Sequence, residues 1–118
     1  MALAGDLKVE EDIVEDFKKL AAEYRAKNPK PTLTEDGHKY KVLAENAFDE
    51  KRYADAMDYF ERWLKIAPWW PSGHYNRALL LAQDKNFEDA VREMKMYLEL
   101  VPDAKDARSS RDKMYIWE

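Results

Sequence analysis

The residue types that most often carry chemistry are sparse in this chain. It has two histidines, His38 and His74, and no cysteine. The histidines fall in different predicted helices and have no carboxylate at metal-ligand spacing beside them, so we expect both to be solvated or to lie at the rim of a packed face. There is no glycine-rich phosphate loop and no nucleophile elbow, and Ser72, Ser109 and Ser110 are typical of turns and caps. The sequence therefore predicts that the chain is not an enzyme and holds no metal or cofactor.

The elements that must position these residues are predicted to be helices. The 118 residues are 46% hydrophobic and 37% charged, with three glycines and no strand-like alternation of apolar and polar positions. This composition is typical of one soluble all-α domain.

Charge and hydropathy exclude two classes of partner. The net charge of −4 argues against nucleic acid, because a protein that binds the phosphate backbone needs a concentrated basic face. No apolar run is long enough for a membrane span or the core of a signal peptide. We therefore expect a cytoplasmic location by default, although a domain excised from an exported protein would have the same composition.

One stretch of the chain occurs twice. Residues 51–68, KRYADAMDYFERWLKIAP, return 34 residues later as residues 85–102, KNFEDAVREMKMYLELVP. Five aligned pairs are identical: Lys51 and Lys85, Asp55 and Asp89, Ala56 and Ala90, Leu64 and Leu98, and Pro68 and Pro102. Six further pairs keep their character. A period of this length built from two helical patterns indicates stacked helix pairs.

The spacing of small, aromatic and proline residues resembles that of the tetratricopeptide repeat (TPR). In the first copy, the four positions of its W-x2-L-G-x2-Y pattern are Tyr40, Leu43, Ala44 and Ala47, and its A-x3-F pair is Ala56 and Phe60. In the second copy the four positions are His74, Arg77, Ala78 and Leu81, so that Arg77 replaces an apolar residue. The resemblance implies an all-α, TPR-type solenoid of antiparallel helix pairs with about six helices.

The repeats divide the chain into two regions. Residues 1–31 form an extra N-terminal helix and a linker, and residues 32–118 form two TPR units, about 37–70 and 71–104, followed by a C-terminal capping helix. Thr32 or Thr34 begins the first repeat helix, and Asp103 caps the last helix. The apolar stripe of the N-terminal helix, Val9, Ile13, Phe17, Leu20, Ala21 and Tyr24, predicts a cap on the first repeat; a lid or a dimerisation arm is the alternative.

Aromatic residues are interpreted as packing. Ala47 is paired with Trp63, and Leu81 with Tyr97, where TPR units usually have the larger residue on the first helix, so volume is exchanged across each helix pair. Of the two tryptophans between the repeats, we expect Trp70 to be in the core and Trp69 to be an exposed anchor for a partner.

The resemblance also implies a concave groove lined by the first helix of each pair. The residues expected to form its partner-binding part are Lys41, Val42, Glu45, Phe48, Tyr75, Asn76, Leu79 and Gln83. Leu79 is an apolar residue in excess of what packing requires, and with Tyr75, Val42 and Phe48 it predicts an apolar patch with a polar rim. A partner peptide, a second copy of the chain or the N-terminal helix would cover this patch.

Two functions are compatible with these features. The first is a protein–protein interaction module that binds a peptide or partner protein in the groove. The second is a structural or self-association domain, either a homodimer or a docking part of a longer protein. Two repeats are fewer than the three that usually make a stable array, and this favours the second function.

Overall fold

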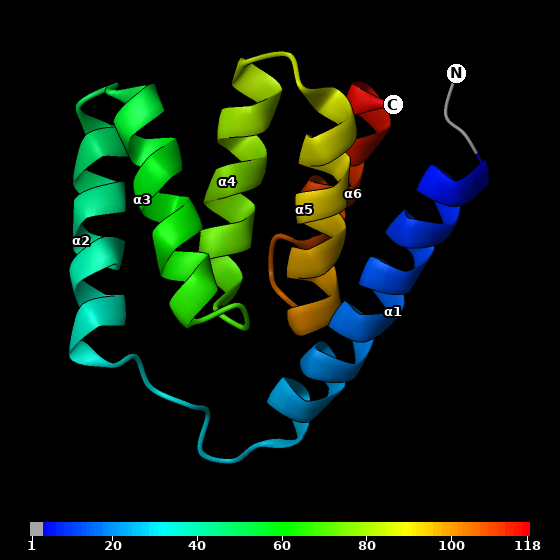
Figure 1. The fold of residues 1–118 in the computed structure, drawn as a ribbon, viewed down its shortest axis with the longest axis horizontal. Helices are drawn as coiled ribbons and strands as arrows, with labels where there is room; N and C mark the ends of the chain where they lie inside the picture. The colour runs from blue at the N-terminus through cyan, green and yellow to red at the C-terminus, as the bar shows by residue number, and fades with distance from the viewer. Residues whose placement is uncertain (1–3) are drawn as a thin grey trace.

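The computed structural model describes the backbone of residues 4–118 and the side chains of residues 15–118. Over this part of the chain it has no strand and six helices: α1 (Ala4–Ala26), α2 (Glu35–Asp49), α3 (Tyr53–Ile66), α4 (Pro71–Gln83), α5 (Phe87–Leu100) and α6 (Ala107–Trp117). The predicted all-α fold with about six helices is confirmed. Helices α2 to α5 lie side by side in chain order, and α6 lies behind α5 (Figure 1).

The 34-residue period is also a period of backbone geometry. The turn inside each helix pair contains a residue in the left-handed region, Lys51 at φ 62° and Lys85 at φ 61°. The amide of the next residue donates to a carbonyl five residues back, from Arg52 to Ala47 and from Asn86 to Leu81. The aligned helix pairs therefore have the same helix–turn–helix conformation. This recurrence is consistent with a helical repeat, and the curved solenoid stays a prediction.

Small residues bring the helices of each pair close together. Ala44, Ala56, Ala78 and Ala90 are fully buried, one on each of the four repeat helices. The exchange of volume predicted from the sequence is present in the core, because Ala47 and Trp63 are both buried without exposed surface. Gly73 continues this close packing between the pairs, since a Cβ atom there would lie 2.7 Å from Cδ2 of Leu64.

The N-terminal helix does not pack where the sequence predicted. Helix α1 packs against α5, in the second repeat, and the linker crosses below the array to reach α2 at its other end (Figure 1). Tyr24 stacks on Trp69 with ring centroids 6.3 Å apart, and Phe17 meets the ring of His74 edge-on at 5.2 Å. Periodicity identified the buried stripe but not its partner, because the surface that receives it combines α5, His74 of α4 and Trp69 of the connection before α4. The side chains of Val9 and Ile13 lie outside the described residues.

Two helix boundaries follow from local hydrogen bonds. The Thr34 hydroxyl accepts a hydrogen bond from the Gly37 amide, so Thr34 rather than Thr32 caps α2. The prediction that Asp103 caps the last helix is wrong, because residues 103–106 form turns and Asp106 precedes α6. These turns repeat the backbone bonds of the earlier connection: Ala104 donates to Val101 as Trp70 donates to Ala67.

We predict that enlarging the buried alanines overpacks the helix pairs. Ala56→Leu and Ala90→Leu should each lower the free energy of unfolding by roughly 1–3 kcal/mol, because neither position has exposed surface. Ala54→Leu, on the exposed side of α3, is the matched control and should unfold like the parent. Urea unfolding of the three variants measures the difference, and equal midpoints would show that these alanines are not at a close crossing.

We also predict a gain in stability at the left-handed turn residues. Glycine adopts positive φ without the clash that a Cβ atom introduces, so Lys51→Gly and Lys85→Gly should each raise the free energy of unfolding by about 0.5–1 kcal/mol. Lys65→Gly, at a helical position in the last turn of α3, should instead lower the free energy of unfolding by up to about 1 kcal/mol. Thermal unfolding of the three variants tests this, and a loss of stability at both turn positions would contradict it.

Candidate functional site

The eight residues predicted to bind a partner lie on two helices. Lys41, Val42, Glu45 and Phe48 are on α2, and Tyr75, Asn76, Leu79 and Gln83 are on α4. We call this set the α2–α4 surface. The two helices are joined through α3, which packs against both, and through Leu80 of α4, which packs in one buried cluster with Ala44 and Ala47 of α2.

The α2 part of this surface combines one apolar residue with a polar pair. Val42 has 50% of its surface exposed, and it is one of the few large apolar side chains in the described part of the chain that remain this open to solvent. Beside it, the Lys41 ammonium donates to the Glu45 carboxylate one turn later. Phe48 meets Tyr53 of α3 edge-on at 6.1 Å and packs on the first core cluster, so most of its role is structural.

The α4 part is more buried. Tyr75 meets Tyr97 of α5 at 5.1 Å and packs against the core of the second repeat. Leu80 is inside the first cluster, and Leu79, about 100° around the helix from it, is half-buried at the edge of that contact. The residues that remain open to a ligand are therefore Val42, Leu79, Asn76 and Gln83, with the Lys41–Glu45 pair as a rim.

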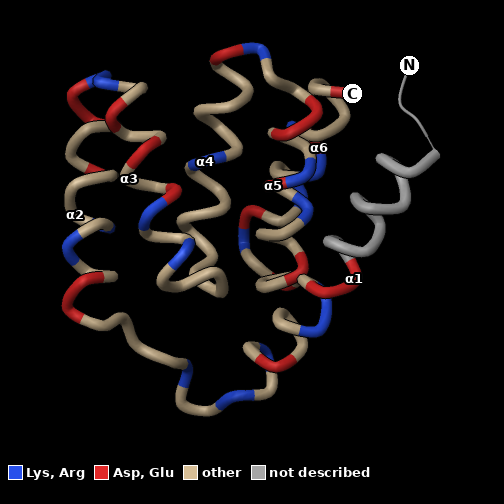
Figure 2. The backbone as a smooth tube through the Cα atoms, in the orientation of Figure 1, with Lys and Arg blue, Asp and Glu red and all other residues tan. Residues whose placement is uncertain are grey.

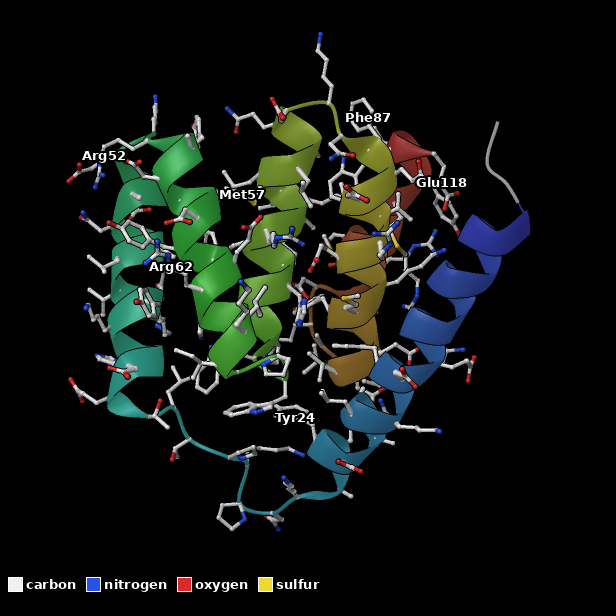
Figure 3. The ribbon with its side chains drawn as sticks, in the orientation of Figure 1. Tyr24, Arg52, Met57, Arg62, Phe87 and Glu118 are labelled. Atoms are coloured by element: carbon white, nitrogen blue, oxygen red, sulfur yellow. The ribbon has the colours of Figure 1, made fainter. Side chains whose placement is uncertain are left out.

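A hollow adjoins this surface between α3 and α4. Its volume is about 450 Å³, and it is lined by Tyr53, Ala54, Met57, Leu80, Gln83 and Asp84. Met57 projects from α3 toward α4 in Figure 3. Of these residues only Gln83 was predicted from the sequence. Tyr53, Ala54 and Met57 were missed because they belong to the second helix of the first pair, whereas the TPR resemblance assigns the groove to first helices alone. Leu80 of α4 and Asp84, which follows α4, were also outside the predicted set.

The sequence predicted His74 to be solvated or at a rim. The structure instead buries it beside a charged neighbour. Its exposed fraction is 5%, and that of Glu93 is 6%. The Nδ1 atom lies 2.7 Å from Oε2 of Glu93, and Nε2 lies 2.6 Å from the carbonyl oxygen of Pro68. Both ring nitrogens thus face oxygen atoms that can accept a hydrogen bond.

Arg77 completes this buried ion cluster of His74, Arg77 and Glu93. Its guanidinium donates to Oε1 of Glu93 and lies 3.5 Å from the carboxylate of Glu61 on α3. The arginine at an apolar position of the second repeat is therefore neutralised by a buried carboxylate on α5. This arrangement could have been suspected from the sequence, because three polar residues, His74, Arg77 and Glu93, occupy positions of the second repeat that face a core.

Burial also shifts two phenols toward their neutral forms. Desolvation and the hydrogen bond that the Tyr97 hydroxyl donates to Asp106, at 2.6 Å, raise the pKa of Tyr97 well above its usual range. Desolvation raises the pKa of Tyr24, whose ring stacks on Trp69. Trp69 is accordingly half-buried under α1 and not the exposed anchor predicted from the sequence. Figure 3 shows Tyr24 at the end of α1 that faces the turn between α3 and α4.

No group of three or more histidine, cysteine, aspartate or glutamate side chains among the described residues is arranged to hold a metal ion. None of the helices within this part of the chain has the length and apolar character needed to cross a membrane.

We predict that the buried ion cluster depends on the charge of Glu93. Glu93→Gln keeps the shape but removes the charge that His74 and Arg77 face, and breaking a buried pair in this way costs about 3–5 kcal/mol. Glu61→Gln, at an exposed contact with the same arginine, should cost less than about 1 kcal/mol. Chemical unfolding compares the two variants, and similar losses would mean that Glu93 is not the counter-ion of the cluster.

Comparison with known proteins assigns no family to the chain. No protein-family model matches the sequence, and no curated protein matches it. The TPR resemblance therefore depends on the residues and the period described above.

Proposed function

We propose that the chain is a TPR-like protein–protein interaction module that binds a peptide or partner protein on the α2–α4 surface. The observation that carries this proposal is the exposure of Val42 beside a polar rim. A half-exposed aliphatic side chain beside the Lys41–Glu45 pair has the composition of a small partner site, with an apolar centre and charged groups around it.

The position of α1 supports the same proposal. The sequence allowed the N-terminal helix to cover the patch, but α1 packs on α5, where Phe17 contacts His74. Of the three occupants considered, a partner peptide and a second copy of the chain therefore remain. A peptide of extended or helical form would contact Val42 and Leu79 and reach the hollow between α3 and α4.

A second candidate function, self-association, is favoured by the last helix. Tyr115 and Ile116 of α6 have 65% and 80% of their surfaces exposed, the highest values among the large apolar side chains that the structure describes. Phe87 of α5 is a further exposed aromatic residue. Two copies that meet through such residues would bury apolar surface that is unfavourable in water.

We predict that reciprocal variants separate these functions. Val42→Lys/Leu79→Lys should bind the partners captured by the chain at least tenfold more weakly, because the two lysines put charge into the apolar centre. Ile116→Lys should bind them with unchanged affinity. Circular dichroism and thermal unfolding confirm that both variants fold. The mass in solution, measured over a range of concentrations, should be that of a monomer. Retention of every partner by the double variant, or a dimer that Ile116→Lys dissociates, would contradict binding at the α2–α4 surface.

A further inference from the structure

A second surface of the molecule concentrates positive charge. A hollow of about 620 Å³ lies between α1, α5 and α6. Its cationic lining residues are Lys18 and Arg25 of α1, Arg92 and Lys95 of α5, and Arg111 of α6, and Glu99 is the only carboxylate among its described lining residues. We call this hollow the basic groove. Blue segments of α1, α5 and α6 are close together in this part of Figure 2.

This groove is unexpected from the composition. The chain has a net charge of −4, and its basic residues are spread along the sequence without a run that would indicate a basic face. The basic groove forms only because α1 returns to pack against α5 and because α6 packs on the same helix. Positive charge therefore comes together from three segments that are distant in sequence.

Part of this positive charge has no counter-charge nearby. Lys18 lies 3.6 Å from Glu15, Arg25 approaches Glu99, and Arg92 lies 3.1 Å from Asp89. For the other two cations, Lys95 and Arg111, none of the described carboxylates is within ion-pair distance, and both side chains are exposed. An anionic ligand would therefore gain contacts with these two cations without displacing an ion pair formed by the described residues.

The floor of the basic groove is apolar. Phe17, Met96, Leu98 and Pro102 line it between the cations. A free inorganic anion would leave this apolar surface uncovered, and a flat lipid surface would not enter a hollow between three helices. Methionine adapts its shape to different apolar side chains, as is common at peptide-binding surfaces. The volume lies in the range of small-ligand and side-chain pockets.

We propose that the basic groove binds an acidic peptide segment of another protein, with aspartate or glutamate side chains placed around one or two large apolar anchors. The carboxylates pair with Lys95 and Arg111, and the anchors cover Phe17 and Met96. This surface is distinct from the α2–α4 surface, so the proposal does not depend on the function proposed above. Because α1 forms one wall, docking of α1 is required for binding.

The experiment uses three labelled synthetic peptides of about five helical turns. The first carries glutamates around two phenylalanines, the second has lysine in place of glutamate, and the third has serine in place of phenylalanine. Fluorescence anisotropy with the whole chain should show binding of the first peptide that weakens as NaCl rises from about 0.05 M to about 0.5 M, because exposed charges are screened. The second and third peptides should bind at least tenfold more weakly.

Paired variants locate the binding site. Lys95→Glu/Arg111→Glu reverses the charge of the two cations that have no described carboxylate within ion-pair distance. This double variant should bind the first peptide at least tenfold more weakly. Lys39→Glu/Lys51→Glu changes the net charge by the same amount on exposed residues of α2 and its following turn, and should bind like the parent. Val42→Lys/Leu79→Lys should also bind like the parent, which separates this proposal from binding at the α2–α4 surface. Thermal unfolding verifies that each variant is folded.

Several outcomes would overturn the proposal. Equal weakening by the two charge-reversal pairs would mean that binding follows net charge and not the groove. Equal binding of the serine peptide would show that the apolar floor is not used. Complete competition by a single-stranded oligonucleotide or by anionic phospholipid vesicles, with tighter binding than the peptide, would assign the groove to nucleic acid or lipid. A dimer that Lys95→Glu/Arg111→Glu dissociates would assign it to a second copy of the chain.

Discussion

The close approach of paired helices at alanine is the constraint on which the rest of the structure depends. With Ala44, Ala56, Ala78 and Ala90 fully buried, each pair leaves room at its ends for large residues such as Trp63 and Tyr97. The same turn, with a lysine at positive φ, closes both pairs, so their helices meet at one geometry. This geometry determines where every later helix can pack, because each pair presents its outer face to the next element.

The two repeats differ in the polar content of their cores. Both have an apolar cluster, and the second also packs His74, Arg77 and Glu93 against each other. The polar cluster has a structural consequence, because the His74 ring that its hydrogen bonds orient also meets Phe17 of α1, with ring centroids 5.2 Å apart. Together with the stacking of Tyr24 on Trp69, in the connection between α3 and α4, this contact accompanies the packing of α1 against α5.

The docking of α1 gives the molecule two surfaces of different chemistry. The α2–α4 surface keeps Val42 in solvent with a balanced polar rim, and the basic groove has an excess of cations over an apolar floor. On α3, Arg62 extends over the Tyr40 ring of α2 and pairs with Asp58 (Figure 3). The two proposed partner sites therefore lie on separate surfaces and differ in charge.

Local patterns in the sequence determined the helices, their period and most of the core. The prolines at 68 and 102 and the alanines at 56 and 90 depend only on residues within two turns of each other, and the structure places them as predicted. The start of α6 was predicted wrongly. The α2–α4 surface could be listed from the sequence, although Phe48 and Tyr75 proved to be packing residues. Only the tertiary structure decided where α1 docks, why His74 is buried and that five cations surround one hollow. These features join residues from segments that are distant in sequence. Neither hydrophobic periodicity nor net charge predicts which helix faces pack against each other.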